Sequence, residues 1–176
     1  MVTYGFLPPP SPAMFAVAAP SAAAKPEAYA ELLVQARALL AGERDFTANG
    51  ANLAALLFHG LDGLNWAGFY WLKGGELVLG PFQGKPACVR IGLGKGVCGT
   101  AAVSRRTVVV PDVHAFPGHI ACDSASRSEV VVPVLAAGRL VGVLDLDSPL
   151  PERFDEEDAR GLEAIVAAFV ECTDLS

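Results

Sequence analysis

The segment Glu129–Ser148, with the sequence EVVVPVLAAGRLVGVLDLDS, shows two strand-like runs on either side of a short connection. Its two halves, Glu129–Leu135 and Arg139–Leu146, are rich in β-branched and aliphatic residues, a composition typical of strands. The connection Ala136-Ala137-Gly138 is short and contains glycine, which favours a β-hairpin. This part of the chain is therefore predicted to be a pair of antiparallel strands.

A second hairpin is expected upstream. Aromatic and β-branched residues fill Trp66–Leu72 and Glu76–Phe82, and Lys73-Gly74-Gly75 joins the two runs. Shorter strands are expected at Ala87–Ile91 and Thr107–Val110. The middle of the chain thus reads as a set of neighbouring strands.

Helical periodicity marks both ends of this strand region. Apolar residues recur at helical spacing in Tyr29–Leu40 and Leu53–Leu64, and a third stripe follows Asp155, which can cap a helix. A shorter helical pattern, Thr100–Val103, follows a glycine-rich turn. Strands in the middle with helices at both ends predict an α+β fold, a mostly antiparallel sheet with helices packed on one face.

Length and composition suit one domain, residues 27–176, preceded by an Ala/Pro-rich tail, residues 1–26, that we expect to be disordered. The net charge of −6, without a Lys/Arg run, argues against nucleic acid as a partner. No apolar stretch reaches the roughly 18 residues of a membrane-spanning helix. The first 24 residues lack the positive charge that starts a secretory signal, so we expect a cytoplasmic protein.

The segment Pro111–Ser128 contains scattered Gly, Pro, Ser and Asp and no sustained period. A loop of this length inside a compact domain usually serves binding or catalysis. It holds His114, His119 and Cys122. We therefore expect part of a functional site here.

Three of the four cysteines, Cys88, Cys98 and Cys122, lie beside Gly, Pro, Asp or Lys, whereas Cys172 follows a helical stripe and is expected to be inert. A structural disulfide is disfavoured in a reducing cytosol. A zinc site would have to combine these cysteines with dispersed histidines and lacks CxxC-like spacing. Redox chemistry, with a disulfide that forms and is reduced again, is the interpretation we favour.

Local sequence favours Cys98 as the thiolate. It follows Gly94-Lys95-Gly96 at the expected start of a helix, where the helix dipole and Lys95 would stabilise negative charge. Cys122 precedes Asp123, whose carboxylate would raise the thiol pKa if it lay close.

Three carboxylates are expected to meet at one end of the hairpin. Asp145 and Asp147 are two residues apart in a strand and so share a face, and the hairpin brings Glu129 close to them. Their mutual repulsion should raise the pKa of at least one, which could then donate a proton at neutral pH. The cluster could bind an ammonium group, but a solvated strand end or a magnesium site would show the same pattern.

Strand alternation places Trp66 and Tyr70 on one face and Phe69 and Trp71 on the other. One pair can pack under the helices while the other lines a pocket.

Several separate motifs resemble the free methionine-(R)-sulfoxide reductases, which are GAF-domain proteins. The resemblance covers roughly residues 27–172, in the order NWAGFY (65–70), LGPFQGK (79–85), GKGVCGT (94–100), GHIACD (118–123) and GVLDLD (142–147). It implies a GAF fold and reduction of free methionine-(R)-sulfoxide, with thioredoxin as the reductant and no metal or organic cofactor. A homodimer is left open.

The resemblance also implies roles for single residues. Cys122 matches the cysteine that attacks the sulfoxide, Cys88 the resolving cysteine and Cys98 an auxiliary thiol, which differs from the preference for Cys98 given by local sequence. The remaining matches form the substrate site: Glu129, Asp145, Asp147, Trp66 and Tyr70. Because a sulfoxide oxygen leaves only when it is protonated, Glu129 and Asp147 are also expected to act as acid catalysts. The alternative is a GAF module that senses a small molecule or redox state without turnover.

Overall fold

The computed structural model describes residues 17–18, 20, 24–118, 120 and 123–175. Six strands form one sheet in the order β3-β2-β1-β6-β5-β4, and every neighbouring pair is antiparallel. The elements are α1 (Lys25–Leu40), α2 (Phe46–Gly60), β1 (Trp66–Lys73), β2 (Glu76–Gly84), β3 (Arg90–Gly92), α3 (Gly96–Ser104), β4 (Val108–Val110), the 3-10 turn η1 (Val113–Ala115), β5 (Ser128–Ala136), β6 (Arg139–Ser148) and α4 (Glu156–Cys172).

Both predicted hairpins are confirmed, and they meet in the centre of the sheet. β1 pairs with β2, β5 pairs with β6, and β1 also pairs with β6, with Trp66 opposite Asp147. The two edge strands, β3 and β4, are shorter than the sequence pattern indicates. The α+β fold with an antiparallel sheet is as predicted.

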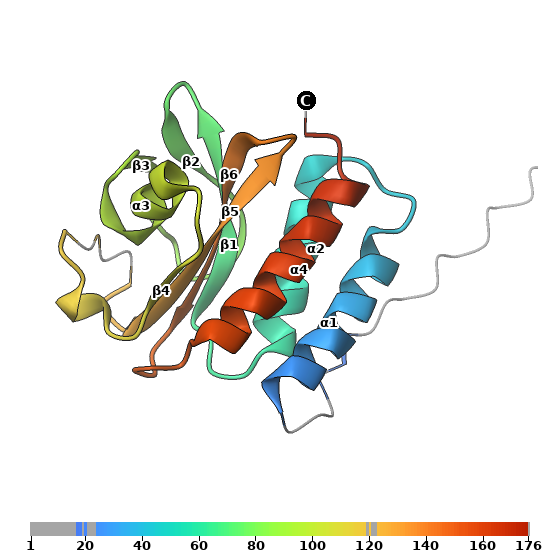
Figure 1. Ribbon diagram of the computed structural model, residues 1–176, viewed down its shortest axis with the longest axis horizontal. Coiled ribbons are helices and arrows are strands. Elements are labelled where there is room, and N and C mark those ends of the chain that lie inside the picture. The colour runs from blue at the N-terminus through green and yellow to red at the C-terminus, as the bar shows by residue number, and fades with distance from the viewer. Residues whose placement is uncertain (1–16, 19, 21–23, 119, 121–122, 176) are drawn as a thin grey trace, which may run out of the picture.

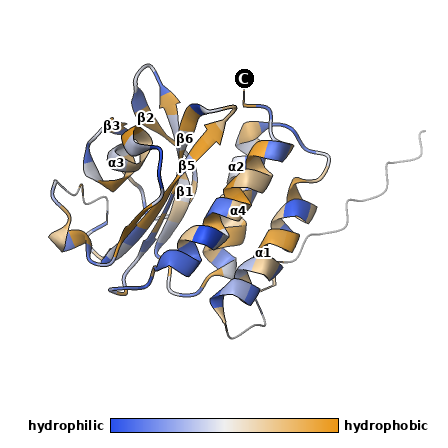
Figure 2. Ribbon diagram, in the orientation of Figure 1, coloured by the Kyte–Doolittle hydropathy of each residue, from blue (hydrophilic) through white to orange (hydrophobic). Residues whose placement is uncertain are grey.

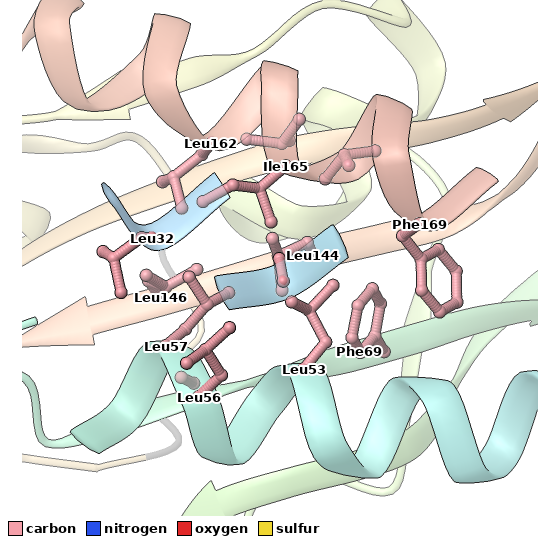
Figure 3. Close-up of a cluster of buried hydrophobic side chains, with 14 of the residues drawn as sticks. Leu32, Leu53, Leu56, Leu57, Phe69, Leu144, Leu146, Leu162, Ile165 and Phe169 are labelled. Carbon is pink, nitrogen blue, oxygen red and sulfur yellow. The ribbon is translucent and has the colours of Figure 1, made fainter. Parts of the chain in front are cut away.

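Helices α2 and α4 cover one face of the sheet, and α1 packs on these two helices (Figure 1). Their apolar stripes meet the inward face of the strands in a core whose labelled members in Figure 3 include Leu53, Phe69, Leu144 and Phe169, all fully buried. Phe69 stacks on Phe169 with ring centroids 5.1 Å apart. In Figure 2 hydrophobic residues follow the central strands, and hydrophilic residues gather at the first turns of α4.

The expectation that all helices pack on one face is wrong for α3. This helix lies on the opposite face, against β5 and β6 (Figure 1). Its buried residues are small, among them Ala101 and Ala102. A helix of small residues has a weak apolar stripe, so periodicity carries little information about which face it covers.

Helix α3 begins earlier than its sequence pattern indicates, and glycines explain the start. Gly96 has a φ of +58°, which a residue with a Cβ rarely adopts. A Cβ on Gly99 would lie 2.4 Å from the carbonyl oxygen of Gly92, so the helix approaches β3 only because the side chain is absent. These contacts place Cys98 in the first turn of α3.

The N-terminal end of α1 is tied to α4 by charged side chains. The Lys25 ammonium lies 2.6 Å from Asp158 Oδ2. The other carboxylate oxygen, Asp158 Oδ1, accepts hydrogen bonds from Tyr29 and Arg153. Most of the predicted tail, residues 1–26, lies outside the described residues, so its disorder stays a prediction. In the part of the chain that the structure describes, no helix is long and apolar enough to cross a membrane.

Candidate active site

A pocket of about 520 Å³, including its open mouth, lies on the α3 side of the sheet. Strands β1, β5 and β6 form its floor, α3 forms one wall, and the segments before β3 and before β5 form the rim. The lining residues are Trp66, Tyr70, Lys85, Pro86, Ala87, Ile91, Lys95, Gly96, Val97, Cys98, Ile120, Asp123, Ser126, Glu129, Asp145 and Asp147.

The three predicted carboxylates meet at the floor of this pocket. Asp145 and Asp147 point to the same face of β6, and Glu129 lies directly opposite Asp147 on β5. Glu129 is 5% exposed and Asp145 6% exposed. The reading of this cluster as a solvated strand end is therefore wrong, because the strand register buries it under α3.

All three carboxyl groups have raised pKa values. Burial is the main cause in each case, and the charge of Asp145 further raises the pKa values of Glu129 and Asp147. Burial raises the pKa of Asp145 to about 7, against hydrogen bonds from Cys98 and Glu129 that lower it. The sequence predicts raised pKa values, but their main cause is burial rather than the predicted mutual repulsion. With a pKa of about 7, Asp145 can donate a proton at neutral pH.

Cys98 lies in the first turn of α3 as expected, but it is not the stabilised thiolate that local sequence favours. Its thiol is buried and donates a hydrogen bond of 3.2 Å to Asp145 Oδ2. Burial, followed by the charges of Asp145 and Glu129, raises the pKa of Cys98 well above its usual value. A helix dipole contributes about 0.3–1 kcal/mol, which is less than the cost of a buried thiolate beside carboxylates.

Trp66 and Tyr70 share the pocket face, as alternation predicts. Their rings stack with centroids 5.8 Å apart, and Trp66 also stacks on Phe82 at 5.4 Å. The indole N–H donates to the Lys85 carbonyl oxygen, and the Tyr70 hydroxyl donates to the Cys88 carbonyl oxygen. These bonds fix both rings and hold the segment before β3 against the pocket.

Sequence reasoning assigned no role to Asn65, Lys85 or Ser126, although the first two fall in the quoted motifs. Asn65 Nδ2 donates to Ser126 Oγ at 3.0 Å and to Asp123 Oδ2 at 3.3 Å. The Lys85 ammonium lies 3.1 Å from Asp123 Oδ2. The hydrogen bond from the Ala125 backbone N–H, followed by those from Lys85 and Asn65, lowers the pKa of Asp123.

Of the cysteines outside α3 that the structure describes, one lies beside the pocket and the other lies away from it. Cys88 is half-buried, and its backbone carbonyl accepts the Tyr70 hydroxyl at one wall of the pocket. Cys172 packs against the opposite core, away from this site. Cys122 and His119 lie outside the described residues, but Ile120 and Asp123 both line the pocket. The chain therefore reaches the pocket on either side of position 122.

The fold and this site define a class of protein. Residues 27–171 match the family model of the GAF domain. A crystal structure from Burkholderia vietnamiensis, described as a GAF sensor protein, is 64% identical with a TM-score of 0.83 over 86% of this chain and 96% of that chain.

Two further relatives are named as one particular enzyme within the GAF-domain proteins. Free methionine-R-sulfoxide reductase from Escherichia coli is 53% identical over 81% of this chain and 87% of its own length. The structure of free methionine-R-sulfoxide reductase from Neisseria meningitidis in complex with its substrate is 47% identical, with a TM-score of 0.86 over 90% of this chain and 95% of that chain. The chain belongs to the free methionine-R-sulfoxide reductase family of GAF-domain proteins.

Proposed function

We propose that this protein reduces free L-methionine (R)-S-oxide to L-methionine. The observation that carries the proposal is the pocket itself, in which the buried carboxyl groups of Glu129 and Asp145 and the half-buried carboxyl group of Asp147 face two stacked aromatic rings. Family membership supports the same reaction, since the relatives named above include a free methionine-R-sulfoxide reductase with its substrate bound.

The pocket suits a small amino acid with a free amine. In the proposed complex, Asp145, Asp147 and Glu129 bind the α-ammonium group and hydrogen-bond the sulfoxide oxygen. Trp66 and Tyr70 pack against the apolar part of the substrate side chain. A buried carboxylate cluster is costly unless a cation or a proton neutralises it, so the bound ammonium group relieves an existing penalty.

In the first chemical step a thiolate attacks the sulfoxide sulfur. The sulfoxide oxygen is transferred to the cysteine as a carboxyl group delivers the proton, the S–O bond of the substrate breaks, and the products are methionine and a cysteine sulfenic acid. We assign the attack to Cys122 from the family resemblance. The raised pKa and the burial of Cys98 support this choice against Cys98.

In the second step a thiol condenses with the sulfenic acid, which yields a disulfide and water. We assign this resolving role to Cys88, which lies beside the pocket in the segment before β3, and an auxiliary role to Cys98. Thioredoxin is the proposed reductant, which fits a cytoplasmic protein because thioredoxin keeps thiols reduced there. No organic cofactor takes part in this scheme.

The direct test is NADPH consumption coupled through thioredoxin reductase and thioredoxin. We expect consumption that depends on this protein and on free methionine-(R)-sulfoxide. The matched controls are the (S) epimer and a Cys122→Ser variant, neither of which should support turnover.

The competing function is a sensory GAF module that binds a ligand without turnover. A methionine sulfoxide that binds the protein but is recovered unreduced, with no disulfide formed, would favour that function over the reductase.

A further inference from the structure

We infer that Cys98, Glu129 and Asp145 form a binding site for a soft divalent cation of the zinc class. Each residue offers one ligand atom, and the thiol sulfur and the two carboxylate oxygens lie within 4.8 Å of one another. All three side chains are buried. A zinc ion with bonds of about 2.0–2.3 Å can contact three such atoms after small side-chain adjustments.

A second observation supports a cation between these three residues, and it concerns the other carboxylate oxygen of Asp145. Asp145 Oδ2 accepts the Cys98 thiol, and the Glu129 carboxyl group lies beside Asp145, but the buried atom Asp145 Oδ1 has no hydrogen-bond donor in good geometry among the described residues. A buried carboxylate oxygen without a donor is costly, and native structures usually satisfy such atoms. A cation between Asp145, Glu129 and the thiol would provide the missing interaction.

The backbone holds the three ligands in a fixed arrangement. Cys98 comes from the first turn of α3, Glu129 from the start of β5 and Asp145 from the C-terminal half of β6. Strands β5 and β6 are paired along their whole length. The glycine contact of α3 with β3 fixes the helix above the strands. Ligands carried by rigid elements lose little conformational entropy on binding.

The chemistry of the donors selects the class of cation. One thiolate and two carboxylates suit Zn²⁺, whereas Mg²⁺ requires an octahedral set of oxygen ligands. The thiol gives its proton to solvent when the metal–sulfur bond forms. The pocket is open at its mouth, so a water molecule can complete a tetrahedral site.

This site overlaps the position that the proposed function gives to the substrate ammonium group. If the proposed function holds, bound zinc inhibits the reductase and competes with methionine sulfoxide. The metal site itself does not depend on that function, because binding can be measured without turnover.

The test uses the reduced full-length protein, freed of metal with a chelator and kept reduced without added thiols. Zn²⁺ affinity is measured by competition with a chromophoric chelator, and Co²⁺ serves as a spectroscopic probe. We expect one bound ion per chain and a thiolate-to-cobalt charge-transfer band. Cys98→Ser should abolish that band, and Cys98→Ser and Asp145→Asn should each weaken Zn²⁺ binding at least tenfold.

Matched controls make the outcome specific to this site. Cys172→Ser, which alters a thiol outside the pocket, should bind Zn²⁺ as the parent does. Mg²⁺ should bind far more weakly than Zn²⁺. Retention of the cobalt band in Cys98→Ser, or its loss in Cys88→Ser alone, would overturn the inference. Reductase activity in a protein that does not bind Zn²⁺ would contradict the metal site and support the reductase proposal. Zn²⁺ binding in a protein without reductase activity would support the metal site and contradict the reductase proposal.

Discussion

At the scale of single residues, Asp145 shows how burial in the pocket affects stability. This carboxyl group is buried in the C-terminal half of β6, and its pKa is raised to about 7. A raised pKa means that the folded protein prefers the neutral acid. Stability contributed by this group is therefore present at low pH and is lost as the pH rises through about 7.

Replacing Asp145 with Asn should remove this pH dependence. The amide cannot ionise, and its oxygen can still accept the Cys98 thiol. From pH 5 upward the unfolded carboxyl group is already ionised, so the loss that remains before the folded group ionises at about pH 7 spans about two pKa units. We therefore expect Asp145→Asn to gain up to roughly 3 kcal/mol relative to the parent between pH 5 and pH 8, at about 1.4 kcal/mol per pKa unit. Urea unfolding of metal-free protein at the two pH values measures the gain.

The matched control for this measurement is Asp62→Asn, which alters an exposed carboxylate outside the pocket. Its stability should stay within about 0.5 kcal/mol of the parent at both pH values. An identical pH dependence in the parent and in Asp145→Asn would show that burial of Asp145 does not strain the fold.

The other two carboxyl groups are expected to act on rate. Glu129→Gln or Asp147→Asn removes an acid or an ammonium partner and changes the shape of the pocket little. A loss of roughly 10²–10⁴-fold in kcat/KM is expected for a general acid. Steady-state kinetics with methionine-(R)-sulfoxide tests this, and a double amide variant with full activity would refute the role.

Asp145 and Cys98 differ in how well the amino-acid sequence predicts their position and their protonation. The carboxylate cluster could be predicted, because strand alternation and the hairpin turn place its members without further information. The state of Cys98 could not be predicted from its neighbours in sequence. Its pKa depends first on burial and then on the charges of Asp145 and Glu129, and both follow from the packing of α3 on β5 and β6.

At the scale of elements, the two terminal helices are joined by charges around Asp158. Its carboxylate is fully buried and accepts hydrogen bonds from Lys25, Tyr29, Arg153 and the backbone N–H of Asp155. This one side chain therefore links α1, α4 and the loop before α4. A buried ion pair that loses one partner is strongly destabilised.

Asp158→Ala should lower the free energy of unfolding by roughly 3–5 kcal/mol, since it leaves Lys25 and Arg153 without this partner. The comparison variant is Glu171→Ala, which breaks the exposed pair with Arg37 between the same two helices. That change should cost less than about 1 kcal/mol. Equal effects of the two variants in urea unfolding would contradict the importance of the buried network.

The elements also differ in how well sequence predicts them. The hairpins and the terminal helices have strong periodicity and turn signals, and the structure confirms them. The short strands β3 and β4 lie at the sheet edges, where few residues pair and the pattern is weak. The face covered by α3 is set by close glycine contacts, which leave no periodic signal in the sequence.

At the scale of the whole molecule, one face of the sheet carries the main hydrophobic core and the other face carries the pocket. Helices α1, α2 and α4 build the main core on one face, and α3 with the segments before β3 and β5 encloses the pocket on the other. The central strands β1 and β6 belong to both layers. Substrate choice is therefore a property of the enclosed pocket and its charge.

The pocket should discriminate strongly against a substrate without a free amine. N-acetylation removes the cation that the carboxylate cluster would bind, and a desolvated charge left unpaired costs several kcal/mol. We expect kcat/KM for free methionine-(R)-sulfoxide to exceed that for the N-acetyl derivative by at least 10²-fold. Comparable values in the same coupled assay would exclude ammonium recognition by this cluster.

The most direct test of the account is methionine release in a single turnover by prereduced protein without added reductant. The parent should release one equivalent from free methionine-(R)-sulfoxide, and Cys122→Ser should release none. Cys88→Ser should release one equivalent and stop as a sulfenic acid, because oxygen transfer needs only the first thiol. Cys98→Ser should react slowly but still release methionine. If Cys122→Ser releases one equivalent and Cys98→Ser releases none, the buried thiol of α3 is the nucleophile and the account is contradicted.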